Sequence, residues 1–196
     1  MNLEENAGVW HIRELIVRIE QRLMNTEITG NNNGRVASLH LHPANSGDPL
    51  EAVEAIDVVE GKGILHEPRY FGRISRKTGQ PSLRQVSLIE REQIGEHAAV
   101  LGLKSIPPGA VRSNIETEGV NLVALVGSEI EIGQAILFVH EPRDPCSQMD
   151  TICQGLRELM MDNRQGVLAT VVRSGKISVG DSIKVRKPNI ETASVS

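Results

Sequence analysis

The spacing of apolar residues changes near residue 35 and predicts one helix followed by many short strands. Between His11 and Met24, isoleucine and leucine recur every three or four residues while arginine and glutamate occupy the other faces, as expected of an amphipathic helix. From Arg35 to the residue before Pro43, apolar and polar residues alternate, which is typical of a half-buried strand. A run rich in Gly and Asn separates the two patterns and ends at Gly34. We therefore expect residues 1–34 to form an N-terminal helix and linker, an appendage to the rest of the chain.

The rest of the chain contains short apolar runs bounded by turns that contain glycine. These runs predict strands over residues 52–59, 135–140, 167–172, 176–179 and 183–185. A capping box from Ser87 to Glu90 predicts a helix to about residue 101 that stops at Gly102, and apolar spacing predicts another over residues 150–163. Many short strands are typical of a barrel or sandwich. We predict a mainly β domain over residues 35–187 with two or three flanking helices, and a flexible tail over residues 188–196.

Composition and charge narrow the class of protein. The chain is 39% hydrophobic and 23% charged, as in an ordinary globular domain. A net charge of −4 and an aromatic content of 2% argue against a nucleic-acid partner. No apolar run is long enough for a membrane span, and the acidic start does not resemble a signal peptide. We expect a cytoplasmic protein without membrane partners, and leave open a homodimer formed through the N-terminal helix.

The segment FVHEPRDPCSQMD, residues 138–150, places a cysteine between an apolar strand and a predicted helix. A thiolate is the nucleophile and metal ligand of cysteine chemistry, and a helix N-terminus together with Arg143 would favour the thiolate of Cys146. The alternative is that Cys146 is a small buried apolar residue. We expect Cys153, on the apolar side of the predicted helix, to be inert core. Two cysteines give neither a disulfide framework nor a zinc site.

The segment from Tyr70 to Leu83 is rich in glycine and basic residues. Five cations fall in or beside it with no acidic residue between them: Arg69, Arg73, Arg76, Lys77 and Arg84. Guanidinium groups bind phosphate bidentately, so the segment is a candidate phosphate site. The alternative is a solvated loop.

Two histidines, His40 and His42, would share one face of the first predicted strand. That spacing suits a metal pair, and the alternative is a solvated polar face.

Several segments together resemble the MOSC domain, which is named for the C-terminal domain of molybdenum cofactor sulfurases. They are GKGILHEPRYFG, RQVSLIE, PPGAVRSNIETEGVNLVAL, IEIGQAILFVHEPRDPC and VVRSGKISVGDSIKV, in that order. The resemblance covers roughly residues 35–187, and no single motif carries it. It implies a MOSC-type β-barrel of short strands with flanking helices.

The resemblance also implies a chemistry for Cys146. The cysteine of the Pro-Cys motif would carry sulfur as a persulfide or ligate the molybdenum of a pterin-bound cofactor, and Asn114 would contact that cofactor. From their charge, we expect Arg73, Arg76 and Arg84 to hold the cofactor's phosphate, with Arg143 beside the thiol.

Two motifs depart from the family pattern. Glu67-Pro68-Arg69 stands where the family shows Gly-Asp-Arg, and Arg112-Ser113-Asn114 stands where it shows Gly-Glu-Asn. The second change replaces an acid and adds Arg112, so this corner becomes more positive. This would suit an anion, or would mark a family member that has changed substrate.

The function implied by the resemblance is that of a molybdenum-cofactor-associated protein. It would be a reductase of N-hydroxylated compounds or a sulfur transferase, working with an electron-transfer protein or a sulfur donor. We expect no pyridoxal phosphate in this chain, because it has no room for a desulfurase domain beside the barrel. The alternatives are a non-catalytic module that binds or carries the cofactor or contacts proteins, and a domain that kept the fold and lost the cofactor.

Overall fold

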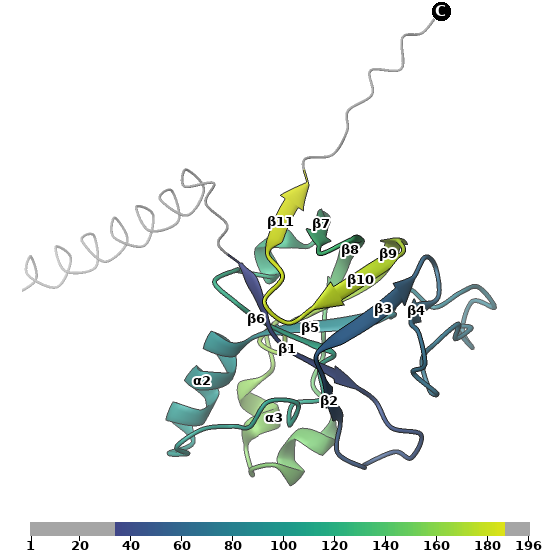
Figure 1. Ribbon diagram of the computed structural model, residues 1–196. Helices are drawn as coiled ribbons and strands as arrows, with labels where there is room; N and C mark the ends of the chain where they lie inside the picture. The colour runs from purple at the N-terminus through teal and green to yellow at the C-terminus, as the bar shows by residue number, and fades with distance from the viewer. Residues whose placement is uncertain (1–33, 187–196) are drawn as a thin grey trace, which may run out of the picture. The chain divides into compact units, whose positions relative to one another are not determined.

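The computed structural model describes residues 34–186 (Figure 1). The helix expected over residues 11–24, its linker up to residue 33 and the expected tail over residues 188–196 lie outside this range. None of the helices within residues 34–186 is long and apolar enough to cross a membrane.

Residues 34–186 contain eleven β-strands, two α-helices and two 3-10 helices. In chain order these are β1 (Arg35–Leu41), β2 (Glu51–Val53), β3 (Ala55–Val59), β4 (Gly63–Ile64), β5 (Val86–Glu90), α2 (Arg91–Val100), β6 (Ile115–Glu118), η1 (Val123–Leu125), β7 (Glu129–Ile132), β8 (Ala135–Pro142), η2 (Ser147–Thr151), α3 (Leu156–Leu159), β9 (Val167–Arg173), β10 (Gly175–Ser178) and β11 (Ile183–Arg186). The prediction of a mainly β domain is therefore confirmed.

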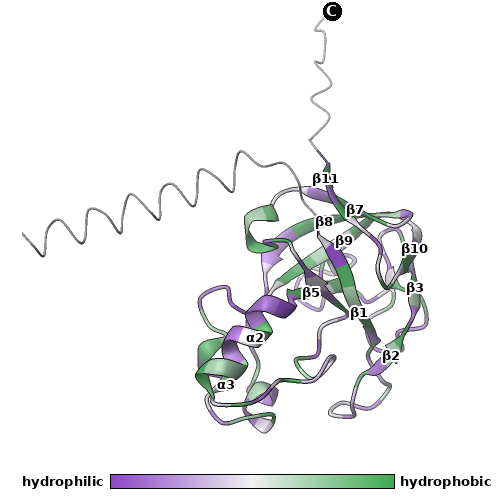
Figure 2. Ribbon diagram, turned by 60° about the vertical axis from the view of Figure 1, so that its left-hand side comes forward, coloured by the Kyte–Doolittle hydropathy of each residue, from purple (hydrophilic) through white to green (hydrophobic). Residues whose placement is uncertain are grey.

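The strands form two sheets. The larger has eight strands in the order β11-β7-β8-β9-β5-β6-β1-β2, and the smaller has three in the order β10-β3-β4. All pairs are antiparallel except β5 with β6. Valine, isoleucine and leucine from both sheets make one buried core, visible as the apolar colouring of the strands in Figure 2. Aliphatic side chains supply this core because the chain has so few aromatic residues.

A closed barrel is not confirmed. The eight-stranded sheet has β11 at one end and β2 at the other. Backbone bonds join the start of β1 to the β10–β11 connection: the Val36 N–H donates to the Asp181 carbonyl, and the Gly180 N–H to the Val36 carbonyl, both at 2.9 Å. These bonds join β1, the strand next to the β2 end of the sheet, to the residues before β11 at the other end, without a continuous ladder.

The predicted capping box is wrong. Residues 87–90 belong to β5, whose five residues are all buried and which pairs with β6 on one side and β9 on the other. Burial on both faces is typical of a parallel pair, and here it outweighs the local capping signal. The helix begins only at Arg91, and Gly102, with φ of 66°, follows its end as predicted.

The helix predicted over residues 150–163 is mostly wrong. The structure has the short η2 and then the four-residue α3, separated by Gly155 with φ of 88°. A left-handed residue cannot continue a right-handed helix, so the apolar residues of this segment lie on two short helical turns instead of one long helix. Together with α2 they pack their apolar residues into a second core that includes Ile94, Met149 and Leu156.

Candidate functional site

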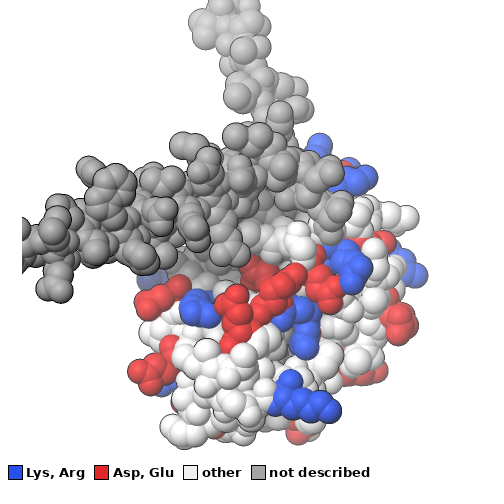
Figure 3. All heavy atoms as spheres, turned by 90° about the vertical axis from the view of Figure 1, so that its left-hand side faces the viewer, with Lys and Arg blue, Asp and Glu red and all other residues white. Residues whose placement is uncertain are grey.

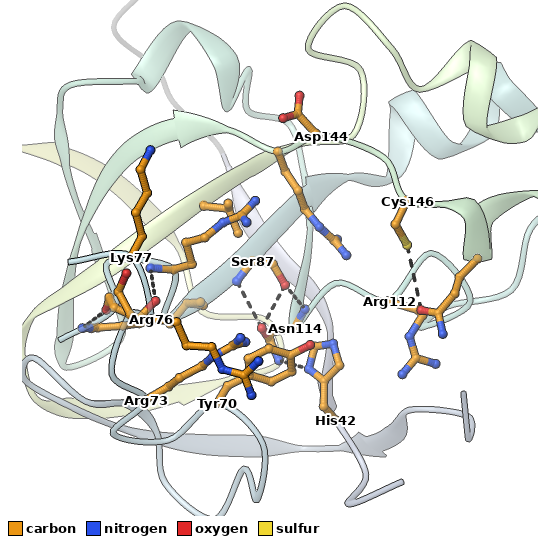
Figure 4. Close-up of a pocket in the computed structure, with 18 residues that line it drawn as sticks. His42, Tyr70, Arg73, Arg76, Lys77, Ser87, Arg112, Asn114, Asp144 and Cys146 are labelled. Atoms are coloured by element: carbon orange, nitrogen blue, oxygen red, sulfur yellow. Dashed lines mark hydrogen bonds between the residues drawn. The ribbon is translucent and has the colours of Figure 1, made fainter. Parts of the chain in front are cut away.

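One cavity of about 540 Å³, which we call the cationic cavity, lies where several loops meet the start of β5 (Figure 4). Its walls come from the loop after β4, the start of β5, the loop before β6 and the segment after β8. The structure brings all the sequence-predicted site residues to this cavity: Arg73, Arg76, Arg84, Arg112, Asn114, Arg143 and Cys146.

The cavity is strongly positive although the chain is not. Six cations line it (Arg73, Arg76, Lys77, Arg84, Arg112 and Arg143), and Asp144 is the one carboxylate among the lining residues. By contrast, the face shown in Figure 3 mixes acidic and basic side chains, and the whole chain carries −4. Within the described part of the chain, one of the six makes an ion pair with a carboxylate: Arg84 with the half-exposed Glu141 at 3.4 Å. Such exposed pairs are weak, so most of this charge is available to a ligand.

The predicted basic loop is an ordered hairpin. The Ser75 N–H donates to the Gln80 carbonyl at 2.9 Å, and the Ser82 N–H to the Arg73 carbonyl at 2.8 Å. At its base, Arg69 and Arg73 lie over the Tyr70 ring, with guanidinium carbons 5.4 and 5.7 Å from the ring centroid. Tyr70 and Arg73 also line the cavity, whereas Arg69 does not, so these contacts hold Arg73 at the cavity wall on a defined backbone.

Cys146 is exposed on the cavity wall, so the alternative of a buried apolar cysteine is wrong. It precedes η2, a 3-10 helix of five residues, rather than the long helix expected. The predicted contribution of a helix macrodipole is therefore not supported. Cys153 is half-buried, packs against the second core and does not line the cavity.

Arg143 is anchored beside the thiol. Its N–H donates to the Gly166 carbonyl at 2.9 Å, and its Nη1 donates to the Ser113 hydroxyl at 2.8 Å. Burial lowers the pKa of Arg143 to about 10, while the nearby Cys146 opposes the shift. A pKa of about 10 leaves the guanidinium charged at neutral pH, so this cation stays fixed beside Cys146.

Arg112 is held by its backbone and by one loop contact. It has φ of 60°, a left-handed conformation that is uncommon for a residue with a side chain, and its Nη1 donates to the Asp48 carbonyl at 2.8 Å. The turn that precedes it, with Gly109 at φ of 78°, directs this side chain to the cavity.

Asn114 lies directly before β6 and is 3% exposed. Its Oδ1 accepts hydrogen bonds from the Ser87 N–H at 3.1 Å and the Ser87 hydroxyl at 2.9 Å. Its Nδ2 donates to Glu67 Oε1 at 2.6 Å and to the His40 carbonyl at 3.2 Å. The amide therefore ties β5, β1 and the loop after β4 together. A cofactor contact by Asn114 stays a prediction, and its polar atoms are already paired with protein groups.

The sequence-based interpretation missed His42 and Glu67 as parts of this site. His42 lines the cavity and is 8% exposed, and His40 is 1% exposed, so a solvated polar face is wrong. Burial lowers the pKa of His40, and the neighbouring Glu116 carboxylate opposes that shift. No group of three or more metal-ligating His, Cys, Asp or Glu side chains occurs within residues 34–186. The sequence did hold one signal that could have drawn attention to Glu67, because this residue stands in a motif that departs from the family pattern.

Comparisons with solved structures agree with this fold. The YUAD protein from Bacillus subtilis is 20% identical, with a TM-score of 0.66 over 78% of this chain and 94% of that chain. YiiM from Geobacillus stearothermophilus is 16% identical, with a TM-score of 0.61 over 81% of this chain and 77% of that one. YiiM from Escherichia coli is 18% identical, with a TM-score of 0.55 over 79% and 69%. At these identities the likeness concerns the fold alone.

The sequence comparisons extend this result. No curated protein matches the chain. The family model described as the MOSC domain matches residues 74–184, which include the basic hairpin from residue 74 onward, the loop before β6 and Cys146. This match spans more than half of the 196 residues. The chain belongs to the MOSC domain family.

Proposed function

We propose that the protein binds the molybdenum cofactor in the cationic cavity and uses Cys146 as a thiolate ligand of molybdenum or as a sulfur carrier. The observation that carries this proposal is the exposed Cys146 on the wall of a cavity lined by six cations. Membership of the MOSC family supports it, because MOSC domains are linked in general to the molybdenum cofactor or to sulfur chemistry.

The residues present fit the cofactor. A thiolate is a soft ligand that suits a soft metal centre, and Cys146 would provide it. A phosphate group fits the exposed cations of the basic hairpin, Arg73, Arg76 and Lys77, because charge-assisted bonds to guanidinium groups are strong and directional. Arg112 and Arg143 would hold negative charge near the thiol. When bound, the cofactor would supply two-electron redox chemistry.

As a reductase, the protein would act on N-hydroxylated compounds and receive electrons from an electron-transfer protein. The protein's own residues would bind the anionic cofactor, keep Cys146 beside the fixed charge of Arg143 and leave room for a small substrate. A cavity of about 540 Å³ is within the usual range for small-molecule sites.

A second candidate function is sulfur transfer, and the exposure of Cys146 favours it. In this version the Cys146 thiolate attacks the outer sulfur of a persulfide on a donor protein. The new bond forms between the Cys146 sulfur and that sulfur, and the donor cysteine leaves as a thiolate. The positive charge of Arg143 would favour the anionic persulfide that results.

The test measures molybdenum by elemental analysis in protein from a host that makes the cofactor. Native protein should carry near-stoichiometric molybdenum, and Cys146→Ser should lose most of it if the thiolate is a ligand. Cys153→Ser is the matched control and should keep the metal, because Cys153 does not line the cavity.

Two other results would change the conclusion. If native protein lacks molybdenum but intact-mass analysis finds one added sulfur atom on Cys146, the sulfur-carrier version holds. If neither molybdenum nor persulfide is found, the proposal fails. Retention of cofactor without turnover of N-hydroxylated compounds would indicate a binding or carrier module.

A further inference from the structure

A histidine and a carboxylate are joined at the wall of the cationic cavity. Glu67 is 2% exposed; its Oε1 lies 2.9 Å from His42 Nδ1 and accepts the His42 backbone N–H at 2.8 Å. The Tyr70 ring packs against the imidazole in a T-shaped arrangement, with ring centroids 4.9 Å apart. Figure 4 shows His42 beside Tyr70 on the cavity wall. The imidazole is thus fixed on one edge and borders the cavity.

The hydrogen bonds of Asn114 decide which ring nitrogen of His42 carries the hydrogen. Asn114 Nδ2 lies 3.1 Å from His42 Nδ1, and both of its hydrogens can be donated to other acceptors, to Glu67 Oε1 at 2.6 Å and to the His40 carbonyl at 3.2 Å. The amide cannot be flipped, because its Oδ1 accepts two hydrogen bonds from Ser87. Nδ1 therefore does not need the Asn114 amide as a donor, and it faces a carboxylate oxygen at 2.9 Å.

Two lone pairs facing each other at 2.9 Å would repel, so His42 Nδ1 must carry a hydrogen and donate it to Glu67. A neutral imidazole has one ring hydrogen, which leaves a lone pair on Nε2. Within residues 34–186, His42 Nε2 has no hydrogen-bond partner. The cavity-lining imidazole is thus in the tautomer of a proton acceptor.

We infer that His42 is the proton-transfer residue of the cationic cavity and that Glu67 is its positioning residue, an inference that rests on the proposed function. The Nε2 lone pair takes a proton from an O–H or N–H group of the bound substrate. The electron pair of the broken bond stays on the substrate, and Glu67 balances the charge of the imidazolium. For an N-hydroxylated substrate, Nε2 first takes a proton from water. As the N–O bond breaks with two electrons from the electron-transfer protein, the imidazolium gives this proton to the departing hydroxide, which leaves as water, and a second proton from solvent completes the amine.

The first experiment needs no cofactor. Two-bond ¹H–¹⁵N correlation spectra of the full chain, recorded with ¹⁵N-labelled histidine at alkaline pH, show the tautomer of each imidazole. His42 should be the Nδ1–H tautomer. His97 and His140 are internal controls with the opposite tautomer, Nε2–H, because the Nε2 atom of each lies 2.9 Å from a backbone carbonyl and must carry the hydrogen.

The Glu67→Gln variant tests the positioning role. A neutral amide removes the charge that favours a hydrogen on Nδ1, so His42 should shift toward the Nε2–H tautomer while His97 and His140 keep theirs. Unchanged control signals also show that the variant folds. An Nε2–H tautomer in the native chain, or a native-like His42 signal in Glu67→Gln, would overturn the inference.

The second experiment measures reduction of hydroxylamine by cofactor-loaded protein with a reduced viologen as electron donor. His42→Gln should keep its molybdenum but lose about 10²- to 10⁴-fold in kcat, together with the pH dependence that the native protein shows. A kcat within threefold of native would overturn the inference. If the native protein holds no molybdenum, the reductase version of the proposed function fails separately, and the tautomer spectra alone decide the role of His42.

Discussion

Replacement of Asn114 by leucine tests whether this residue holds the site together. Its side chain makes four buried hydrogen bonds: two accepted from Ser87, one donated to Glu67 and one to the His40 carbonyl. At roughly 1 kcal/mol net for each bond, the loss is about 4 kcal/mol. The apolar surface of leucine recovers about 1 kcal/mol, so the free energy of unfolding should fall by about 3 kcal/mol. Native domains have only about 5–15 kcal/mol in total, so this is a large effect.

Urea unfolding followed by circular dichroism measures this change in the free energy of unfolding, and equal m-values for the native and variant chains are required for the comparison. Asn114→Asp has nearly the same size but places a carboxylate oxygen where Nδ2 lies 2.6 Å from Glu67 Oε1, so it should cost more than the leucine. The matched control is Asn45→Leu, where an exposed amide donates to Asp48 at 3.1 Å, and its cost should stay within about 0.5 kcal/mol. A loss below about 1 kcal/mol for Asn114→Leu would refute the structural role and leave the amide free for a cofactor.

Three further changes test the fold and the cavity. Gly166→Ala should unfold the domain or lower the free energy of unfolding by more than about 3 kcal/mol in urea titrations, because a Cβ at this position would lie 2.0 Å from a carbonyl oxygen of β5. The control is Gly180→Ala. Gly180 also has a positive φ but has open space around it, so this change should lower the free energy of unfolding by only about 1–2 kcal/mol. Burial raises the pKa of Glu90 above 4.5, so the folded state holds this proton more tightly and loses stability as pH rises through the folded pKa. The unfolding free energy of Glu90→Gln relative to native should therefore increase between pH 4 and pH 8, and a pH-independent difference would contradict this. Arg76→Gln with Lys77→Gln should raise the Kd for inorganic pyrophosphate about tenfold by calorimetry, whereas Lys104→Gln, outside the cavity, should leave it unchanged.

Much of the β architecture was predictable because its signals are local. The strand predicted over residues 135–140 is β8, and those over 167–172 and 183–185 are β9 and β11, each bounded by the glycine turns seen in the sequence. The two helix errors have physical causes. At Ser87 the local capping signal was overridden by burial between two strands, and at Gly155 a left-handed residue divides an apolar pattern that alone fits a helix.

Part of the candidate site was also predictable from the sequence, and part of it was not. Charge along the chain and the family resemblance were enough to select Cys146 and the arginines, and the structure places them around one cavity. The pairing of His42 with Glu67 was not predictable, because these residues are 25 positions apart and meet only through the arrangement of β1 and the loop after β4. Whether Asn114 contacts a ligand also depended on its partners, which no local pattern reveals.

The backbone bond between Arg143 and Gly166 has a consequence for the order in which the protein matures. Gly166 precedes β9, which pairs with both β5 and β8. During synthesis, the basic hairpin and the cysteine therefore leave the ribosome before the strand that holds them together. Long-range pairings of this kind fold slowly. A ligand that needs the assembled cavity cannot bind early, and at one hundred times its Kd it would stabilise the finished domain by about 2.7 kcal/mol. Cofactor loading would thus act as a late check on completed folding.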